Sequence, residues 1–594
     1  MARRETFMTI PLPNLGQWKT NMRAIWDAPG TKAKARAFNE TVKIDQEETL
    51  FSDGTVWSNK GAVLPASSGL GISADSLLDL DPIPPEQRTW RAWDYMSYWA
   101  SDQFAIATWE FAASMVAQGF TLREIVPLTF VGMFITGLVC VMSGHIAAKY
   151  RIGFPMSTRM SWGMRFGWFP VLVRSFTAMM WLGILNLSIA QCIHQMLRAV
   201  WPDFDDIPNT LPESAGITSA DLLCYFILII IQTPLTLIPI YKLKWYFVMK
   251  AIISPMVFIG MMIWALVVTK NGGPLVVQAA HLEGSEWDKG WARLKAIGNA
   301  SGLFATVACN IPDFSRYAKT TRGAWMQAIA LPLTGMIPVI CSVITCSACI
   351  QLYGESFWNP ALILEKWENR AAVFFAAIVW IIATIGVNLS ANTITVSIAL
   401  TSFFPRYINN IRGSLLVAVI SIIIVPWKIV YSSGSFYNFL NAYPCLIGPI
   451  SGILLSDYWL VRRRSLDVRH LYARGGKFWF TGGYNWRAAV AWLGALAPNL
   501  PGFIHQIAPS VPDVQPYTYN FSWFFGIVIS MALFWFCNYV WPPTYSLSGP
   551  AVHPDDVVDW DTRTRVGNWS DMPGSVIEAQ EEKGADISID SEKK

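Results

Sequence analysis

The sequence predicts an all-α, polytopic membrane protein with twelve transmembrane helices. Hydrophobic residues make up 53% of the 594-residue chain and charged residues only 14%, whereas a soluble domain carries about a quarter charged residues. Apolar segments of about 20 residues, the length that crosses the hydrocarbon core, follow one another between residues 93 and 541. The loops between them differ systematically in their Lys and Arg content, which gives the predicted helices an orientation.

Three regions are expected along the chain. Residues 1–92 are polar and lack the apolar stretch of a signal peptide, so they predict a cytosolic arm. Residues 93–541 predict the transmembrane domain. Residues 542–594 end in "AQEEKGADISIDSEKK" and predict a disordered, acidic cytosolic tail. The nine cysteines are scattered, several within apolar runs, which indicates reduced thiols and neither a disulfide framework nor a zinc site.

The loop charges orient the predicted spans, which centre near residues 107, 136, 182, 230, 257, 305, 338, 387, 420, 446, 494 and 531. Lys and Arg concentrate after even-numbered spans, as in "VRRRSLDVRHLYARGGK" after the tenth. The loop after the third span, "WPDFDDIPNTLPESAG", is acidic instead. By the positive-inside rule the even-numbered loops and both termini are cytosolic.

The eighth span contains an unusually polar stretch, "NLSANTITVS", at residues 388–397. At about 100° per residue, it has two polar faces, which are Asn388, Asn392 and Thr395 on one side and Ser390, Thr393 and Ser397 on the other. Polar groups within a membrane face the bundle or a cavity. Two such faces favour a helix that lines a ligand or ion site, and interhelical hydrogen bonding is the alternative for either face alone.

The first and sixth spans both look interrupted. The first, "YWASDQFAIATWEF", holds Asp102, Gln103 and Glu110, and buried carboxylates indicate function. For Asp102, a position at a helix end that water reaches is an equal alternative. Glu110 is expected to act in structure or in proton coupling. The sixth, "AIGNASGLFATVACNIPDFSRYAK", is weakened around Gly302 and stopped at Pro312. Interrupted helices at equivalent positions predict two inverted repeats around a midplane site.

Several motifs, in order, carry a family resemblance: "YRIGFPMSTRMSWG", "FPVLVRSFTAMMWLGI", "NIPDFSRYAK", "NLSANTIT" and "GGYNWRAAVAW". From about Trp93 to Trp541 the chain resembles the nucleobase–cation symporter-1 family, and its fungal uracil, uridine, allantoin and thiamine permease branch. The resemblance implies a leucine-transporter-like core of two inverted five-helix repeats plus two peripheral helices. It also implies alternating access at the plasma membrane, no cofactor, and coupling to H⁺ rather than Na⁺.

The same resemblance implies a substrate site. The ring of the substrate is expected between Trp181 of the third span and Phe304 of the sixth, beside Gly302, because aromatic faces favour planar rings. Gln103 of the first span and Ser188 of the third belong to the same expected site.

Two positions depart from the family pattern. Relatives usually carry an amide where this chain has Leu185 and Ile398. A substrate that needs such an amide would be buried with an unpaired polar edge, which is expensive. We therefore expect a less polar or differently shaped heterocycle than uracil, such as allantoin, a nucleoside or a vitamin-like compound.

Coupling and gating residues follow from the resemblance and from position. In sodium-coupled members, ligands come from the first and eighth spans, which here are the backbone at 100–105 with Asn392 and Thr393. Asp102 and Glu110 are the candidates for proton coupling. Asp313 and Arg316, an i,i+3 pair at the predicted cytosolic end of the sixth span, are expected to act in gating or structure.

Other functions receive less support. A non-transporting sensor built on a transporter fold is the alternative, because the positions of Leu185 and Ile398 have lost their amides. The six histidines show no metal-ligand spacing, and no Gly-rich phosphate loop joins a strand to a helix, so an enzyme is not expected. The expected partners are a small heterocycle and the lipid bilayer, not nucleic acid. The resemblance further implies ubiquitin-ligase machinery acting through the cytosolic tails.

Overall fold

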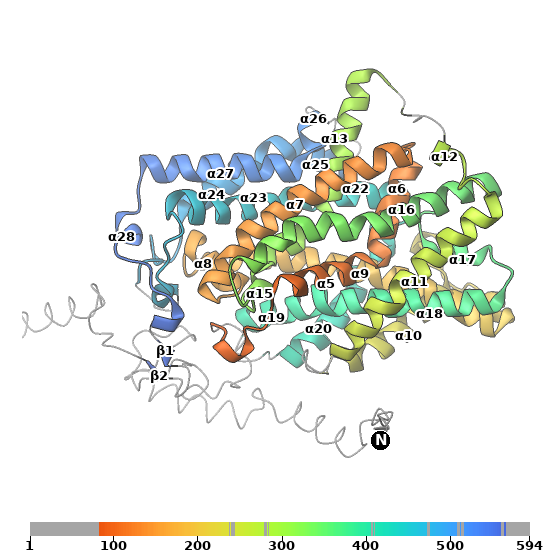
Figure 1. The fold of residues 1–594 in the computed structure, drawn as a ribbon, viewed down its shortest axis with the longest axis horizontal. Helices are drawn as coiled ribbons and strands as arrows, with labels where there is room; N and C mark the ends of the chain where they lie inside the picture. Colours follow the sequence, from red (N-terminus) through yellow and green to blue (C-terminus); the bar gives the residue numbers. More distant parts are fainter. Residues whose placement is uncertain are drawn as a thin grey trace, which may run out of the picture.

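The computed structural model describes residues 82–565, apart from 237, 239–243, 278–281, 283, 405–407, 409, 472–475, 508–510, 512–515, 557 and 560–563. Most of the predicted N-terminal arm and the acidic end of the tail lie outside the described residues. Figure 1 shows the long helices packed side by side, with α8 and α28 at one end of the bundle and α6, α12 and α17 at the other.

The bundle is built from helices that match the apolar segments of the sequence. In chain order they are α5 (Ala92–Gln103), α6 (Ile106–Ala117), α7 (Leu122–Tyr150), α9 (Trp168–Val200), α10 (Ser219–Thr236), α11 (Lys244–Thr269), α13 (Glu286–Gly302), α14 (Ala305–Asn310), α16 (Gln327–Tyr353), α18 (Arg370–Val387), α19 (Ile394–Phe403), α20 (Asn410–Ile423), α22 (Ser433–Ala442), α23 (Pro444–Leu455), α24 (Trp486–Leu496), α25 (Leu500–Ile507) and α27 (Ser522–Val540).

Shorter elements join these helices. The short α-helices are α8 (Phe154–Trp162), α12 (Pro274–Val277), α15 (Pro312–Ser315), α17 (Pro360–Glu365), α21 (Pro426–Ile429), α26 (Pro516–Tyr519) and α28 (Thr544–Leu547). The 3₁₀ turns are η1 (Pro85–Gln87), η2 (Pro202–Asp206), η3 (Glu213–Ala215), η5 (Gly323–Met326), η8 (Val468–Leu471), η9 (Ala497–Asn499) and η10 (Pro554–Asp556). Two π-helical turns are η6 (Asn388–Thr393) and η7 (Ser456–Val461). Strands β1 (Val558–Asp559) and β2 (Thr564–Arg565) pair antiparallel.

Within the described residues, eight helical segments are long and apolar enough to cross a membrane. They coincide with predicted spans centred near 136, 182, 230, 257, 338, 387, 446 and 531. The segments near 107, 305, 420 and 494 are helical but broken or short, so they do not reach this length. The polytopic all-α class is confirmed, and twelve crossings remain a prediction.

The predicted interruptions of the first and sixth spans are confirmed. Helix α5 ends at Gln103 and α6 begins at Ile106, whose backbone N–H lies 3.4 Å from the hydroxyl of Thr384 in α18. Helix α13 ends at Gly302, where a Cβ would collide with the carbonyl oxygen of Leu440 in α22. The hydroxyl of Tyr443 donates to the Gly302 carbonyl. Neighbouring helices therefore supply partners for backbone groups near each break, as a low-dielectric bundle requires.

The polar stretch of the eighth span forms the π-helical turn η6 between α18 and α19. A π-turn widens the helix by one residue, and such turns are frequent at functional sites. Gly386 precedes the turn, and a Cβ there would lie 2.7 Å from the Cδ atom of Lys250 in α11. The glycine therefore makes room for a long cationic side chain in the middle of the bundle.

A segment beyond the last long helix is folded against the end of the bundle that carries α8. We call residues 544–556 the strap. The backbone N–H of Val552 donates to Leu466 (3.0 Å), and the Val552 carbonyl accepts from Val468 (3.3 Å). Asp555 accepts two hydrogen bonds from Arg88, of 2.8 and 2.6 Å. The predicted disordered tail from residue 542 is therefore wrong for residues 544–556, because backbone pairing and this ion pair hold them in place.

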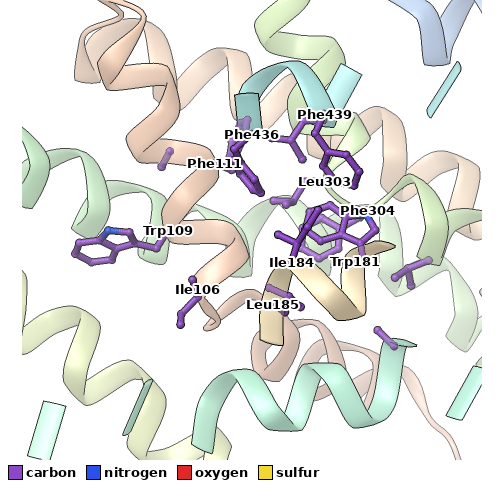
Figure 2. Close-up of a cluster of buried hydrophobic side chains, with 14 of the residues drawn as sticks. Ile106, Trp109, Phe111, Trp181, Ile184, Leu185, Leu303, Phe304, Phe436 and Phe439 are labelled. Atoms are coloured by element: carbon purple, nitrogen blue, oxygen red, sulfur yellow. The ribbon is translucent and has the colours of Figure 1, made fainter. Parts of the chain in front are cut away.

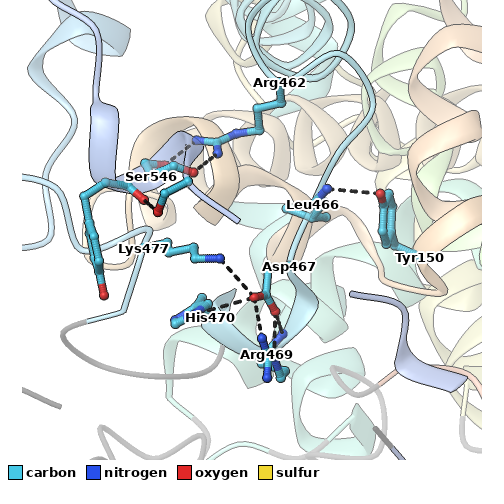
Figure 3. A network of polar contacts seen from close by, with 10 residues as sticks. Tyr150, Arg462, Leu466, Asp467, Arg469, His470, Lys477 and Ser546 are labelled. Carbon is cyan, nitrogen blue, oxygen red and sulfur yellow. Dashed lines mark hydrogen bonds and ion pairs between the residues drawn. The ribbon is translucent and has the colours of Figure 1, made fainter. Parts of the chain in front are cut away.

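The loop beneath the strap carries a compact polar network (Figure 3). Asp467 accepts from Arg469 (2.8 Å) and Lys477 (3.1 Å) and lies 3.6 Å from His470 Nε2. Burial alone would raise the pKa of Asp467. The hydrogen bond from Arg469 and the surrounding positive charges outweigh burial and hold this pKa below its usual value. Burial lowers the pKa of His470 to about 4. At neutral pH the histidine is therefore uncharged, and Asp467 is neutralised by Arg469 and Lys477.

Candidate functional site

Trp181 lies in a buried aromatic box near the middle of α9. Its side chain is only 5% exposed. Three rings of α22 and the start of α23 meet it edge to face, which are Phe439 at 5.3 Å, Tyr443 at 5.8 Å and Phe436 at 6.1 Å between ring centroids. Aromatic side chains favour stacking with planar rings. The box therefore suits a heterocycle.

Phe304 stands at the break between α13 and α14. It belongs to the same buried cluster as Trp181, and Figure 2 shows the two side chains in one close-up with Leu303 and Phe439. The ring of Trp99 in α5 meets Phe304 edge to face at 5.5 Å. The two helix breaks are thus joined by an aromatic contact.

Gln103 ends α5 and is fully buried. Its amide nitrogen donates to the carbonyl of Leu331 in α16 (3.2 Å), and its amide oxygen accepts from Thr108 (3.4 Å). These contacts hold the broken first span against α16.

Leu185, Ser188 and Ile398 are not equivalent in the structure. Leu185 lies in the cluster with Trp181 and Phe304, one turn along α9 (Figure 2). Ser188 lies a further turn along and donates to Glu110 at 2.7 Å. Ile398 is buried in α19, outside the cluster that holds Trp181 and Phe304. Of the two expected departures from the family pattern, Leu185 is the one that lies in the aromatic cluster.

Asp102 is buried and faces Lys250, a partner that the sequence pattern did not indicate. Its Oδ1 atom lies 3.9 Å from Nζ of Lys250 in α11, with side chains 5% and 0% exposed. Tyr98 and Ser390 are its other polar neighbours. Asp102 does lie at a helix end, one residue before α5 finishes, but it is closed off from water in this arrangement. The signal in the sequence was a lone lysine, in "YFVMKAIISP", at the start of an apolar run.

The two polar faces of η6 have different neighbours. On one face, an amide relay runs from Asn392 to Asn388 (2.9 Å), from Asn388 to Asn186 of α9 (2.8 Å), and from Asn186 to Ser421 of α20 (3.3 Å). This face joins three helices. The opposite face, with Ser390, lies toward Asp102.

The expected pair of cation ligands is therefore divided. The amide of Asn392 belongs to the relay toward α9 and α20. The hydroxyl of Thr393 is buried and has no hydrogen-bond partner in the described structure.

Glu110 lies at the centre of a second buried polar cluster. Its Oε1 atom accepts from the Ser188 hydroxyl (2.7 Å) and from the amide of Asn359 (3.2 Å). Asn359 also donates to Gln191 at 2.6 Å. The carboxyl group is fully buried and its Oε2 atom has no hydrogen-bond partner in the described structure. Neither residue could be singled out from the sequence, because Asn359 stands in a connecting segment and Gln191 is one polar residue within the apolar run of α9.

Asp313 and Arg316 lie at the end of the bundle that carries α8. One carboxylate oxygen of Asp313 accepts the backbone N–H of Phe154, at the start of α8, at 2.8 Å. Arg316 Nε donates to the backbone carbonyl of Asp313 at 3.2 Å, and its guanidinium lies over the ring of Tyr317. The carboxylate thus ties α15 to α8, which fits the expected gating or structural role.

Comparisons with known proteins agree with this architecture. The family model "Permease for cytosine/purines, uracil, thiamine, allantoin" matches residues 82–526. The chain is similar to the uracil permease of Saccharomyces cerevisiae, with 30% identity over 86% of this chain and 83% of that protein. It is also similar to the allantoin permease of the same yeast, with 31% identity over 78% of this chain and 75% of that protein.

Among solved structures, the inward-facing conformation of Mhp1, a nucleobase-cation-symport-1 family transporter, has a TM-score of 0.64. It is 21% identical, and the match covers 82% of this chain and 98% of Mhp1. This likeness confirms the five-helix inverted-repeat fold, and the family matches confirm a transporter rather than an enzyme. The chain belongs to the family of permeases for cytosine and purines, uracil, thiamine and allantoin.

Proposed function

We propose that this permease is a secondary active symporter that imports a nucleobase-related heterocycle together with a proton by alternating access. The observation that carries the proposal is the buried aromatic box around Trp181, which lies beside two helix breaks in a chain of this permease family. Broken helices that converge at the middle of a bundle are typical of transporters whose site is alternately exposed.

The pair of Asp102 and Lys250 supports a proton as the coupling ion. The ammonium of Lys250 occupies the space beside the break of the first span, where a sodium ion was the alternative. A fixed cation next to Asp102 supplies the positive charge that sodium would bring. Unlike sodium, a lysine can gain and lose a proton in place, and buried lysines do so readily.

The apolar lining of the aromatic cluster supports a substrate less polar than uracil. Leu185 lies in the aromatic cluster where relatives usually carry an amide, so one ring edge of the substrate meets a hydrocarbon surface. The uracil and allantoin permeases among the relatives are named for compact polar heterocycles. We infer that this chain takes a related ring with one apolar edge.

The sidedness follows from charge. The end of the bundle with α8 and the strap carries Arg159, Arg316 and Arg462–Arg464. By the positive-inside rule this end is cytosolic. We propose that the protein lies in the plasma membrane with both termini in the cytosol, where the tails are available to ubiquitin ligases.

The proposal is tested by uptake in a yeast strain that lacks its own permeases. Radiolabelled uracil, uridine, allantoin, hypoxanthine, thiamine and nicotinamide riboside are offered side by side to cells with verified surface expression. We expect accumulation of one compound, collapse of uptake on addition of a protonophore, and no effect of sodium replacement. Sodium-dependent uptake would overturn the proton assignment. No uptake of any compound would favour the sensor alternative.

A further inference from the structure

A short segment closes the end of the bundle opposite the strap. We call residues 357–365, which include α17, the cap segment. In Figure 1, α17 lies at the end away from α8 and α28. Phe357, Asn359 and Pro360 are buried, so the segment is seated in the bundle rather than lying on its surface. The Phe357 carbonyl accepts from the thiol of Cys346 in α16 at 3.3 Å.

An aromatic column links the cap segment to the substrate box. The ring of Trp358 stacks on Phe436 of α22, with centroids 6.0 Å apart and planes 28° apart. Phe436 in turn meets Trp181 edge to face at 6.1 Å. Any movement of the cap segment therefore alters a ring that touches the expected substrate-stacking residue.

A polar contact fastens the same segment. Asn359 precedes α17, and its amide oxygen accepts the N–H of Ala361 at 2.8 Å. Its amide nitrogen donates both to Glu110 of α6 (3.2 Å) and to Gln191 of α9 (2.6 Å). Glu110 and Ser188 are bonded to each other at 2.7 Å. Glu110 thus joins the broken first span, α9 and the cap segment at one atom.

The charge state of Glu110 decides whether this contact is stable. Both donors converge on Oε1, and Oε2 is buried with no partner in the described structure. No Lys, Arg or His of the described chain pairs with the carboxyl group. Ser188 and Asn359 face it as neutral groups, and the thiol of Cys192 is its titratable neighbour. An unpaired carboxylate is costly to bury, so the closed cluster holds the neutral acid with its proton on Oε2.

We propose that Glu110 is a proton-operated latch for the cap segment. With a proton on Oε2, the carboxyl group keeps Asn359 and Ser188 on Oε1 and the cap segment closed over the substrate box. When the proton passes to water, the carboxylate accepts more strongly from its two neutral donors, but this gain is smaller than the cost of keeping an unpaired charge buried. Water therefore enters to solvate the carboxylate, Asn359 exchanges it for water, and the cap segment opens. Glu110 is a proton site separate from the Asp102–Lys250 pair, so the latch adds proton control of the external entrance to the proposed symport, and in that respect it rests on the proposed function.

The test reads the position of the cap segment directly. Cys346 lies under Phe357 and becomes accessible when the segment lifts. The full-length protein in intact yeast cells is labelled with a membrane-impermeant maleimide in acidic and in mildly alkaline medium. Labelling of Cys346 is quantified by mass spectrometry as the modified fraction of that residue, and Cys445 of α23, which is also buried, serves as the background control. No substrate is added, so the result is independent of whether the uptake assay succeeds.

Matched variants isolate the latch. Glu110→Gln retains an acceptor for Ser188 and Asn359 but cannot ionise. Glu124→Gln removes a carboxylate at the start of α7 that pairs with Arg293 at 3.0 Å instead. Because thiols react faster as pH rises, variants are compared with the wild type at the same pH. The ratio of ionised to protonated Glu110 changes about tenfold per pH unit. The difference in Cys346 labelling between the wild type and Glu110→Gln is therefore expected to grow steeply with pH.

The expected result is specific to Glu110. In alkaline medium, Cys346 is labelled several-fold more in the wild type and in Glu124→Gln than in Glu110→Gln, and in acidic medium all three are equally low. Asn359→Ala, which removes the tether while leaving Glu110, should be labelled strongly at both pH values. Equal labelling of the wild type and Glu110→Gln in alkaline medium would overturn the proposal. So would labelling of Asn359→Ala that stays as low as that of Glu110→Gln.

Discussion

The buried pair of Asp102 and Lys250 makes the sharpest prediction about both stability and coupling. The two charged atoms lie 3.9 Å apart with almost no exposure. At this distance and an effective dielectric constant near 20, their attraction is about 4 kcal/mol. Lys250→Met keeps the length of the side chain that Gly386 accommodates, and it leaves Asp102 buried without its cation. Removing one partner of a buried pair costs about 3–5 kcal/mol.

The pair of single variants and the double variant separates this cost from other effects. Lys250→Met and Asp102→Asn should each lower the thermal midpoint of the detergent-solubilised, fluorescently tagged protein, measured by size-exclusion chromatography after heating. Lys250→Met/Asp102→Asn should recover most of the loss, because replacing both members of a buried pair is close to neutral. The double variant should be folded yet unable to accumulate substrate against a gradient.

Two results would refute this reasoning. If Lys250→Met were as stable as the wild type, the lysine would not be neutralising Asp102. If the double variant were no more stable than the weaker single variant, the two side chains would not be acting on each other. Accumulation that persisted in the double variant, and still collapsed with a protonophore, would move proton coupling away from this pair.

Three further predictions concern the site, the helix break and the loop under the strap. Trp181→Ala should weaken substrate interaction about 5- to 150-fold, since loss of one stacking ring costs about 1–3 kcal/mol, while surface expression seen by microscopy is unchanged. Normal uptake would remove Trp181 from the site. Gly302→Ala should destabilise the protein by about 1–3 kcal/mol through overpacking against α22. Gly260→Ala should not, because no atom lies within 4 Å of the added Cβ. Equal thermal midpoints of the two variants would contradict this. The pKa of His470 is lowered from 6.5 to about 4, so its contribution to stability is present above 6.5 and is lost as pH falls toward 4. His470→Gln should remove this loss, which is at most about 3 kcal/mol of unfolding free energy, and should therefore flatten the curve of thermal midpoint against pH over this range. An unchanged slope would show that the acid sensitivity arises elsewhere.

Features that depend on local pattern could be predicted from the sequence. The class of the protein, the positions of the helices and the two interruptions follow from apolar run length and from the residues that weaken a helix. The two polar faces expected for the eighth span have separate neighbours, since the face with Asn388 makes interhelical hydrogen bonds to α9 and the face with Ser390 lies toward Asp102. The π-turn η6 was not foreseen, because a 100° wheel assumes regular α-helix.

Features that depend on which helices meet could not be predicted in the same way. Lys250 belongs to a separate span from Asp102, and only the packing of α11 against α5 brings them together. The rings around Trp181 come from α22, far along the chain, whereas the sequence pointed to Phe304. Asn359 lies in a connecting segment whose burial arises from tertiary packing. Long-range pairing of this kind leaves no periodic trace in one sequence.

The contacts of the strap can form only at the end of synthesis. Arg88 stands before the first helix and Asp555 after the last long one, and their two hydrogen bonds join parts of the chain that are synthesised at opposite ends of translation. Arg462 likewise depends on the Ser546 hydroxyl, at 2.8 Å. Arg88 and Arg462 have earlier partners in the Ile83 carbonyl and Asp457, but their hydrogen bonds to the strap form only after the ribosome has delivered residue 556. A fluorescent reporter inserted directly after α27 would interrupt that step, whereas one placed beyond the acidic tail would leave it intact.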